Sequence, residues 1–125
     1  MTSTYMHITI TGVHIEITHA IREYVEERMN ALSKYANKEK GAMRISVELS
    51  KTSGHHVHGD VYQVEVQAER SGLHINIKAI KNDLYAAIDE VRDKLAREIT
   101  ERKDKEMSLF KRGAQRIKRI LKVID

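Results

Sequence analysis

The fold of this chain is decided by residues 62–79, which read YQVEVQAERSGLHINIKA. Apolar and polar side chains alternate on both sides of Ser71-Gly72, as they do in strands that have one buried and one wet face. Ser71-Gly72 suits a hairpin turn, because glycine tolerates the left-handed backbone that tight turns require. The stretch predicts two antiparallel strands of a sheet that is covered on one side only.

Two earlier segments show the same alternation. Residues 6–11 alternate until Gly12, and residues 43–50 place an apolar side chain at every odd position. Both patterns have the period of two that is typical of strands. Together with the hairpin, they predict a sheet of four strands.

A helix is expected between the first two strands. Thr18 suits its N-cap position, because a threonine hydroxyl can accept a hydrogen bond from a free backbone N–H, and the helix then runs to about Tyr35. Its apolar stripe consists of Ile21, Val25, Leu32 and Ala36, with Tyr24, Met29 and Tyr35 near the edges. The stripe gives this helix one face to pack against the sheet.

A second helix is expected after the last strand. Asn82 or Asp83 caps its start, and it extends to roughly Lys105. Its apolar stripe consists of Leu84, Ile88, Val91, Leu95 and Ile99. After Ser108 the sequence reads as a separate, short amphipathic helix. The apolar side of that helix is formed by Ile117, Ile120, Leu121 and Ile124.

These elements predict an α+β fold with the order β-α-β-β-β-α. A right-handed β-α-β crossover makes the first two strands parallel, so the four-stranded sheet is mixed. Both helices are expected to pack on its one apolar face, and a basic helical tail follows at the C-terminus. We divide the chain into a domain of residues 1–106 and a tail of residues 107–125. The chain contains no proline, so no strand or helix has an obvious interruption.

Composition limits the class of protein. A length of 125 residues suits a single hydrophobic core. The chain has no cysteine, which excludes disulfides and thiolate metal sites and favours a reducing compartment. No apolar run approaches the roughly 18–20 residues that cross a bilayer. The first residues also lack the features of a signal peptide, so we expect a cytoplasmic protein that starts at Met1 or Met6.

Charge is distributed unevenly along the chain. Residues 107–125 hold six basic residues and one acid, a net charge of +5. Residues 1–106 hold sixteen basic and seventeen acidic residues, a net charge of −1. A basic tail on a nearly neutral body indicates a polyanionic partner, either nucleic acid or an anionic membrane surface.

No group of residues predicts catalysis. The serines lack the glycine-rich surroundings of a nucleophile elbow, and the six glycines do not form a phosphate-binding loop. His55, His56 and His58 form the cluster that most resembles a metal site, because imidazoles bind zinc. A closed zinc site would, however, need further ligands nearby. We therefore expect neither an enzyme nor a cofactor nor a native metal site, and we expect His7 and His74 to lie on the wet faces of their strands.

Several segments resemble the family of ribosome hibernation promoting factors and ribosome-associated inhibitors, in its short form. The second helix carries the most specific motif, because both its buried and its charged positions agree. The role of Tyr85 within that motif stays open. The agreeing segments are Ile8–Gly12, Glu16–Thr18, Ile21–Val25, Asp83–Asp89, Asp93–Arg97 and Lys103–Lys105.

The resemblance implies a function. Members of this family bind the small ribosomal subunit in the channel between its head and body, where messenger and transfer RNA pass, and keep the ribosome idle. Binding relies on basic residues that meet ribosomal RNA phosphates. Carried over to this chain, with the tail added for its charge, the candidates are Arg22, Arg28, Lys34, Lys94, Arg97, Arg102, Lys103, Lys105, Lys111, Arg112, Arg116, Lys118, Arg119 and Lys122.

Alternatives remain open at two places. Arg28 lies at the apolar edge of its helix, so packing of its stem competes with a role in binding RNA. The tail suits an extra contact with ribosomal RNA, a membrane-surface helix, or self-association with a second copy. We favour the RNA contact and expect no membrane partner. The main alternative function is a membrane-surface or protein-interaction module that acts through the basic C-terminal helix.

Overall fold

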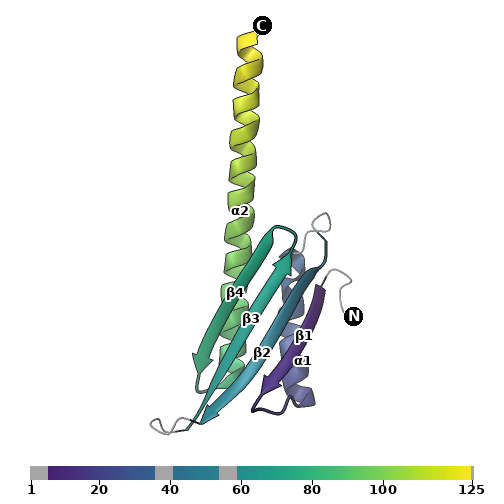
Figure 1. Cartoon of the computed structure of the whole chain (residues 1–125), viewed down its shortest axis with the longest axis vertical. Coiled ribbons are helices and arrows are strands. Elements are labelled where there is room, and N and C mark those ends of the chain that lie inside the picture. The colour runs from purple at the N-terminus through teal and green to yellow at the C-terminus, as the bar shows by residue number, and fades with distance from the viewer. Residues whose placement is uncertain (1–5, 36–40, 54–58, 125) are drawn as a thin grey trace.

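The computed structural model describes residues 6–35, 41–53 and 59–124. A sheet of four strands has two helices on one side, and the second helix continues far beyond the sheet (Figure 1). The elements are β1 (Met6–Val13), α1 (His19–Asn30), the 3₁₀ helix η1 (Ala31–Tyr35), β2 (Met43–Ser53), β3 (Asp60–Arg70), β4 (Leu73–Lys81) and α2 (Leu84–Ile124). This is the predicted α+β order of elements.

The sheet has the predicted mixed topology. Its strand order is β1-β2-β3-β4, with β1 parallel to β2 and the other two pairs antiparallel. The register aligns Ile10, Val47, Val66 and Ile77 in one row across all four strands. Neighbouring apolar positions therefore form one continuous face, which the helices cover.

The β3–β4 hairpin turns at Ser71-Gly72, as the alternation predicts. The two strands are separated by these two residues alone, and Gly72 has a φ of +76°. Only glycine adopts such a left-handed conformation at no steric cost. The turn therefore sets the register that places the apolar side chains of both strands on the same side.

The core lies between this face and the two helices. Val25, Met29 and Leu32 are buried on the first helical segment, and Ile88 and Leu95 on α2. Met29 is fully buried and not at the edge of the stripe, because it follows Val25 by four residues within α1 and so lies on the same face of the helix. Each such side chain contributes roughly 1.5–3 kcal/mol by leaving water.

Both predicted helix starts are capped as expected. The backbone N–H of Ile21 donates to Oγ1 of Thr18 at 3.2 Å, and that of Tyr85 donates to Oδ1 of Asp83 at 3.0 Å. Asp83, and not Asn82, is therefore the cap of α2. The caps satisfy N–H groups that have no partner within the helix.

The prediction that the second helix ends near Lys105 was wrong. α2 is one helix of 41 residues from Leu84 to Ile124. The apolar stripe is interrupted at residues 101–106, but these residues are good helix formers and contain neither glycine nor proline. A break in the stripe ends the contact with the sheet without ending the helix.

Gly12 fills a position where a side chain does not fit. A Cβ atom there would lie 2.6 Å from the carbonyl oxygen of Ile15 and 3.0 Å from Cδ1 of Ile17. We expect Gly12→Ala to lower the free energy of unfolding by about 1–3 kcal/mol, as overpacking does. Urea denaturation measures this. Gly113→Ala is the control, because the space around Gly113 is open and alanine favours the helix there, so it should not lower the free energy of unfolding.

Candidate nucleic-acid interface

One side of α2 carries a row of exposed basic side chains. Because the helix is unbroken, spacings of three, four, seven or eight residues, which are about one or two turns, place them on one face beside the buried stripe. We call this row the basic ridge; it consists of Lys94, Arg97, Lys105, Arg112, Arg116 and Arg119. From Lys94 to Arg119 it extends about 38 Å, at 1.5 Å per residue.

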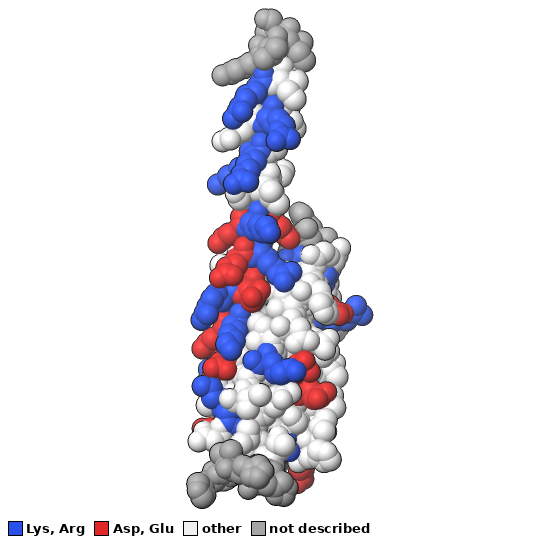
Figure 2. Space-filling model, turned by 60° about the vertical axis from the view of Figure 1, so that its left-hand side comes forward, with Lys and Arg blue, Asp and Glu red and all other residues white. Residues whose placement is uncertain are grey.

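The two ends of the ridge differ in their electrostatics. Along the body, acidic and basic side chains alternate, whereas residues 107–121 of α2, which we call the projecting helix, carry basic side chains without acidic ones (Figure 2). A shallow hollow of about 430 Å³ on the body illustrates the balance, since Lys81, Lys94 and Arg97 share it with Asp89, Glu90 and Asp93. Positive potential therefore grows toward the C-terminus.

Lys94 shares one carboxylate with a second lysine. Nζ of Lys81 lies 3.3 Å from Oε1 of Glu90, and Nζ of Lys94 lies 3.5 Å from Oε2. The hydrogen bond from Lys81, supported by the charge of Lys94, holds the pKa of Glu90 below its ordinary value. Two lysines therefore share the single negative charge of Glu90.

The other basic residues that were predicted to bind RNA differ in whether they have a partner within the protein. Arg102 lies 3.7 Å from Glu98, and Nζ of Lys34 lies 5.2 Å from the centre of the Tyr35 ring. Within the described residues, the remaining candidates on α1, α2 and the projecting helix have no ion-pair partner within 4.0 Å. They are Arg22, Arg97, Lys103, Lys105, Lys111, Arg112, Arg116, Lys118 and Arg119. The side chain of Lys122 lies outside the described ones.

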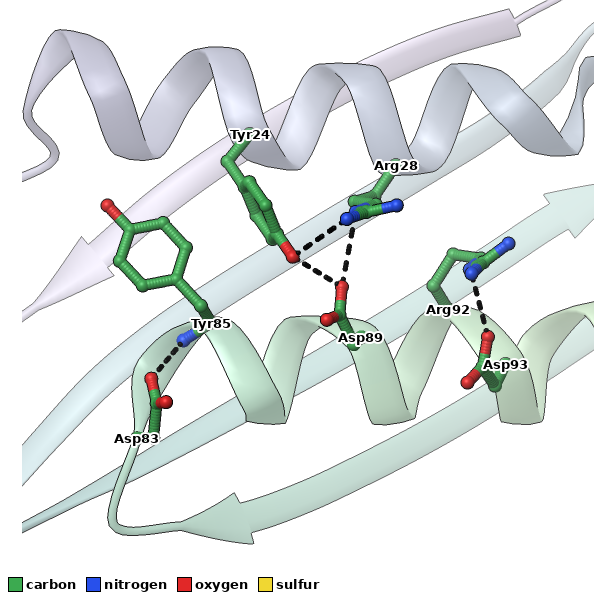
Figure 3. A network of polar contacts seen from close by, with 7 residues as sticks. All are labelled: Tyr24, Arg28, Asp83, Tyr85, Asp89, Arg92 and Asp93. Carbon is green, nitrogen blue, oxygen red and sulfur yellow. Dashed lines mark hydrogen bonds and ion pairs between the residues drawn. The ribbon is translucent and has the colours of Figure 1, made fainter.

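Arg28 belongs to a network that joins the two helices (Figure 3). The hydroxyl of Tyr24 donates to Oδ1 of Asp89 at 2.7 Å, and Nη2 of Arg28 donates to the Tyr24 oxygen at 3.1 Å. Nε of Arg28 also lies 3.2 Å from that Asp89 oxygen as an ion pair. The alternative that Arg28 packs at the edge of its helix fits this geometry. A contact between Arg28 and RNA stays a prediction.

Tyr24 is fixed in the same network by its ring and by its hydroxyl. Its ring meets that of Tyr85 edge-on, with the centres 4.8 Å apart. Burial, together with the hydrogen bond to Asp89, raises the pKa of Tyr24, so the hydroxyl keeps its proton and remains a donor. Tyr85, whose role the sequence left open, thus packs against α1 at the start of α2.

Sequence reasoning did not identify Asp89 as a structural contact. Asp89 and Tyr24 are 65 residues apart, and no local pattern links them. The one available signal was the position of Asp89 one turn after Tyr85, on the α2 flank that faces α1. The network holds α1 against α2, and so fixes the distance between the basic residues of the two helices.

The histidines lie as predicted where the structure describes them. His7 and His74 are exposed on the outer face of the sheet, in one row with Arg44 and Glu69. Nδ1 of His74 lies 3.0 Å from Oε1 of Glu69. No three metal-ligating side chains cluster within the described residues, and the loop of His55, His56 and His58 lies outside them.

Comparison with known families gives one match over most of the chain. Residues 8–107 match the family described as Sigma 54 modulation protein / S30EA ribosomal protein. The match covers the sheet and both packed helices, and it ends where the projecting part of α2 begins. No helix of the described residues is both long and apolar enough to cross a membrane.

Individual relatives agree with this match. A ribosome hibernation promoting factor of Escherichia coli is 35% identical over 100 residues, which are 80% of this chain and 96% of that protein. One of Pseudomonas putida is 29% identical over 111 residues, which are 89% of this chain and 100% of that protein.

Solved structures share the fold. The N-terminal domain of Protein Y from Thermus thermophilus is 32% identical, with a TM-score of 0.64 over 75% of this chain and 96% of that one. A ribosomal subunit interface protein from Coxiella burnetii is 22% identical, with a TM-score of 0.64 over 79% of this chain and 99% of that one, and supports the fold alone.

The network between the helices makes a stability prediction. Asp89→Ala should lower the free energy of unfolding by about 1–2 kcal/mol, because the Tyr24 hydroxyl and Arg28 lose a shared acceptor. Asp93→Ala is the matched control, since among the described residues Asp93 pairs with its neighbour Arg92 alone and should change stability by less than about 0.5 kcal/mol. Urea denaturation of both variants checks this; equal effects would contradict it.

Proposed function

Because this chain belongs to the family of ribosome hibernation promoting factors, the Sigma 54 modulation protein / S30EA ribosomal proteins, we propose where on the ribosome it acts. It binds ribosomal RNA of the small subunit, in the channel between head and body through which messenger and transfer RNA pass. Occupation of that channel keeps the ribosome idle and intact. The protein acts in the cytoplasm, where ribosomes are.

The basic ridge is the observation that supports this proposal. Folded ribosomal RNA is recognised largely by its shape and its phosphates, which calls for a rigid surface bearing lysine and arginine. An α-helix whose residues from Leu84 to Ile99 are packed on a sheet provides such rigidity. Arg97 and Lys105 are exposed and lack ion-pair partners among the described residues, so their charges are available to phosphates.

The remaining candidates extend this surface. Arg22 and Lys34 lie on the first helical segment, and the network of Tyr24, Arg28 and Asp89 sets their distance from the ridge. The basic residues of the projecting helix lengthen the contact along the RNA. Each phosphate that a basic residue neutralises adds nearly one unit to the salt dependence of binding.

The proposed function needs no bond to be made or broken. Inhibition follows from mutual exclusion, since two molecules cannot occupy one channel. The arrangement therefore supports a binding protein without a cofactor and not an enzyme, in keeping with the relatives, which are named as hibernation factors.

Charge reversal on the ridge tests the RNA contact. The double variant Lys94→Glu, Arg97→Glu should weaken co-sedimentation with small subunits by roughly 100-fold or more, because each reversal removes a phosphate contact and adds a repulsion. The slope of log affinity against log salt should fall by about two. Lys78→Glu is the control, because Lys78 is exposed on the opposite side of the sheet.

Equal loss in the control and the double variant would contradict a role for the ridge. Wild-type affinity in the double variant would contradict it as well. Circular dichroism of each variant confirms that the fold is retained.

Truncation separates the contributions of body and projecting helix. A chain that ends at Ser108 retains every side chain of the core, so it should fold and still co-sediment with small subunits at low salt. Its binding should be lost at a lower salt concentration than that of the full chain, since up to six basic residues are missing. Absence of binding for both chains at low salt would refute the proposed function.

A further inference from the structure

The projecting part of α2 exposes large apolar side chains that the RNA contact does not use. Phe110 is 73% exposed, and four others on the same side are 54–60% exposed. We call them the apolar stripe: Leu109, Phe110, Ile117, Ile120 and Leu121. Contiguous exposed apolar surface of this kind marks an interaction site.

The apolar stripe continues the buried face of α2 beyond the sheet. Ile117 follows Ile99, the last buried residue, by eighteen residues, which is about five full turns. Ile99 is 1% exposed and Ile117 is 60% exposed, and the C-terminal part of α2 projects past the sheet (Figure 1). Among the described residues nothing covers the stripe.

The charges beside the stripe restrict its partner. Residues 107–125 have a net charge of +5, so pairing with the same segment of a second copy would bring about ten like charges together. RNA would engage the basic side and leave five apolar side chains in water. An anionic lipid surface can bind both sides of such a helix. The apolar side enters the acyl boundary, and the basic side lies among the headgroups.

We propose that the apolar stripe of α2 docks this protein on an anionic membrane surface. The helix lies in the interface and does not span the bilayer, which agrees with its low apolar content. Arg116 and Lys118 stand on the two flanks of the stripe, where their long side chains reach the headgroups. This binding goes beyond the proposed ribosome contact, because it uses the apolar stripe, which lies off the basic ridge; Arg116 belongs to the ridge and also flanks the stripe.

The body of the protein determines how the helix meets the surface. The stripe lies on the same side of α2 as the sheet, so the body prevents the helix from lying flat along its whole length. The helix must enter at an angle, with the turns around Ile120 deepest and Leu109 near the rim. Substitutions should therefore matter more at Ile120 than at Leu109.

Flotation of the full chain with lipid vesicles tests the proposal. We expect binding to phosphatidylcholine vesicles that contain phosphatidylglycerol, and little binding to phosphatidylcholine alone. Ile120→Glu should weaken binding at least about tenfold more than Gln115→Glu, which introduces the same charge on the side away from the stripe. Leu109→Glu should have an intermediate effect.

Three results would overturn the proposal. The first is absence of binding to the anionic vesicles. The second is an equal effect of Ile120→Glu and Gln115→Glu, which would make the attraction purely electrostatic. The third is a dimer, seen by analytical ultracentrifugation, that Ile120→Glu dissolves, because the stripe would then serve a second copy.

Measuring ribosome binding of Ile120→Glu distinguishes membrane docking from the proposed binding to the small subunit. Ile120→Glu should co-sediment with small subunits as Gln115→Glu does, because Ile120 lies off the basic ridge and both variants introduce the same charge. If the unmodified chain fails to bind the anionic vesicles but co-sediments normally with small subunits, the membrane proposal alone is refuted. Loss of small-subunit binding in Ile120→Glu but not in Gln115→Glu, with helical content intact in both, would assign the stripe to the ribosome and also overturn the proposal.

Discussion

The whole structure depends on the single apolar face of the sheet, which must be removed from water. A row such as Ile10, Val47, Val66 and Ile77 crosses all four strands, and burial of these side chains requires helices along the entire width. The two helices must then turn their apolar stripes inward, so their charged side chains face outward. Presentation of lysine and arginine to a partner is thus a by-product of covering the sheet.

Periodicity predicted most of this fold because each element repeats its own rule along the chain. The alternation in residues 62–79 fixed both strands, their turn and their buried face, and Thr18 and Asp83 are caps because of side-chain chemistry that acts locally. The end of α2 was missed for the opposite reason. The polar residues at 101–106 change what the helix touches but not its backbone preference, and a pattern of burial reports only the former.

The candidate interface was less predictable than the fold, because ion pairing is a tertiary property. The sequence identified Lys94 and Arg97 alike, yet Lys94 shares Glu90 with Lys81, which lies on β4. Arg28 looked like an available cation until the structure brought Asp89 beside it from the other helix. Which of many charged residues remain free depends on such partners, and no periodicity encodes them.

The unbroken course of α2 has a mechanical consequence. A helix without a hinge acts as a lever. A force applied near Arg119 is therefore transmitted to the packed turns at Leu95 and Ile99, which a flexible linker would not do. From Ile99 to Arg119 the lever arm measures about 30 Å. Pulling at the C-terminal end would therefore exert a torque on the core itself. A force on this end of α2 could thus detach the whole domain from a surface to which it is bound.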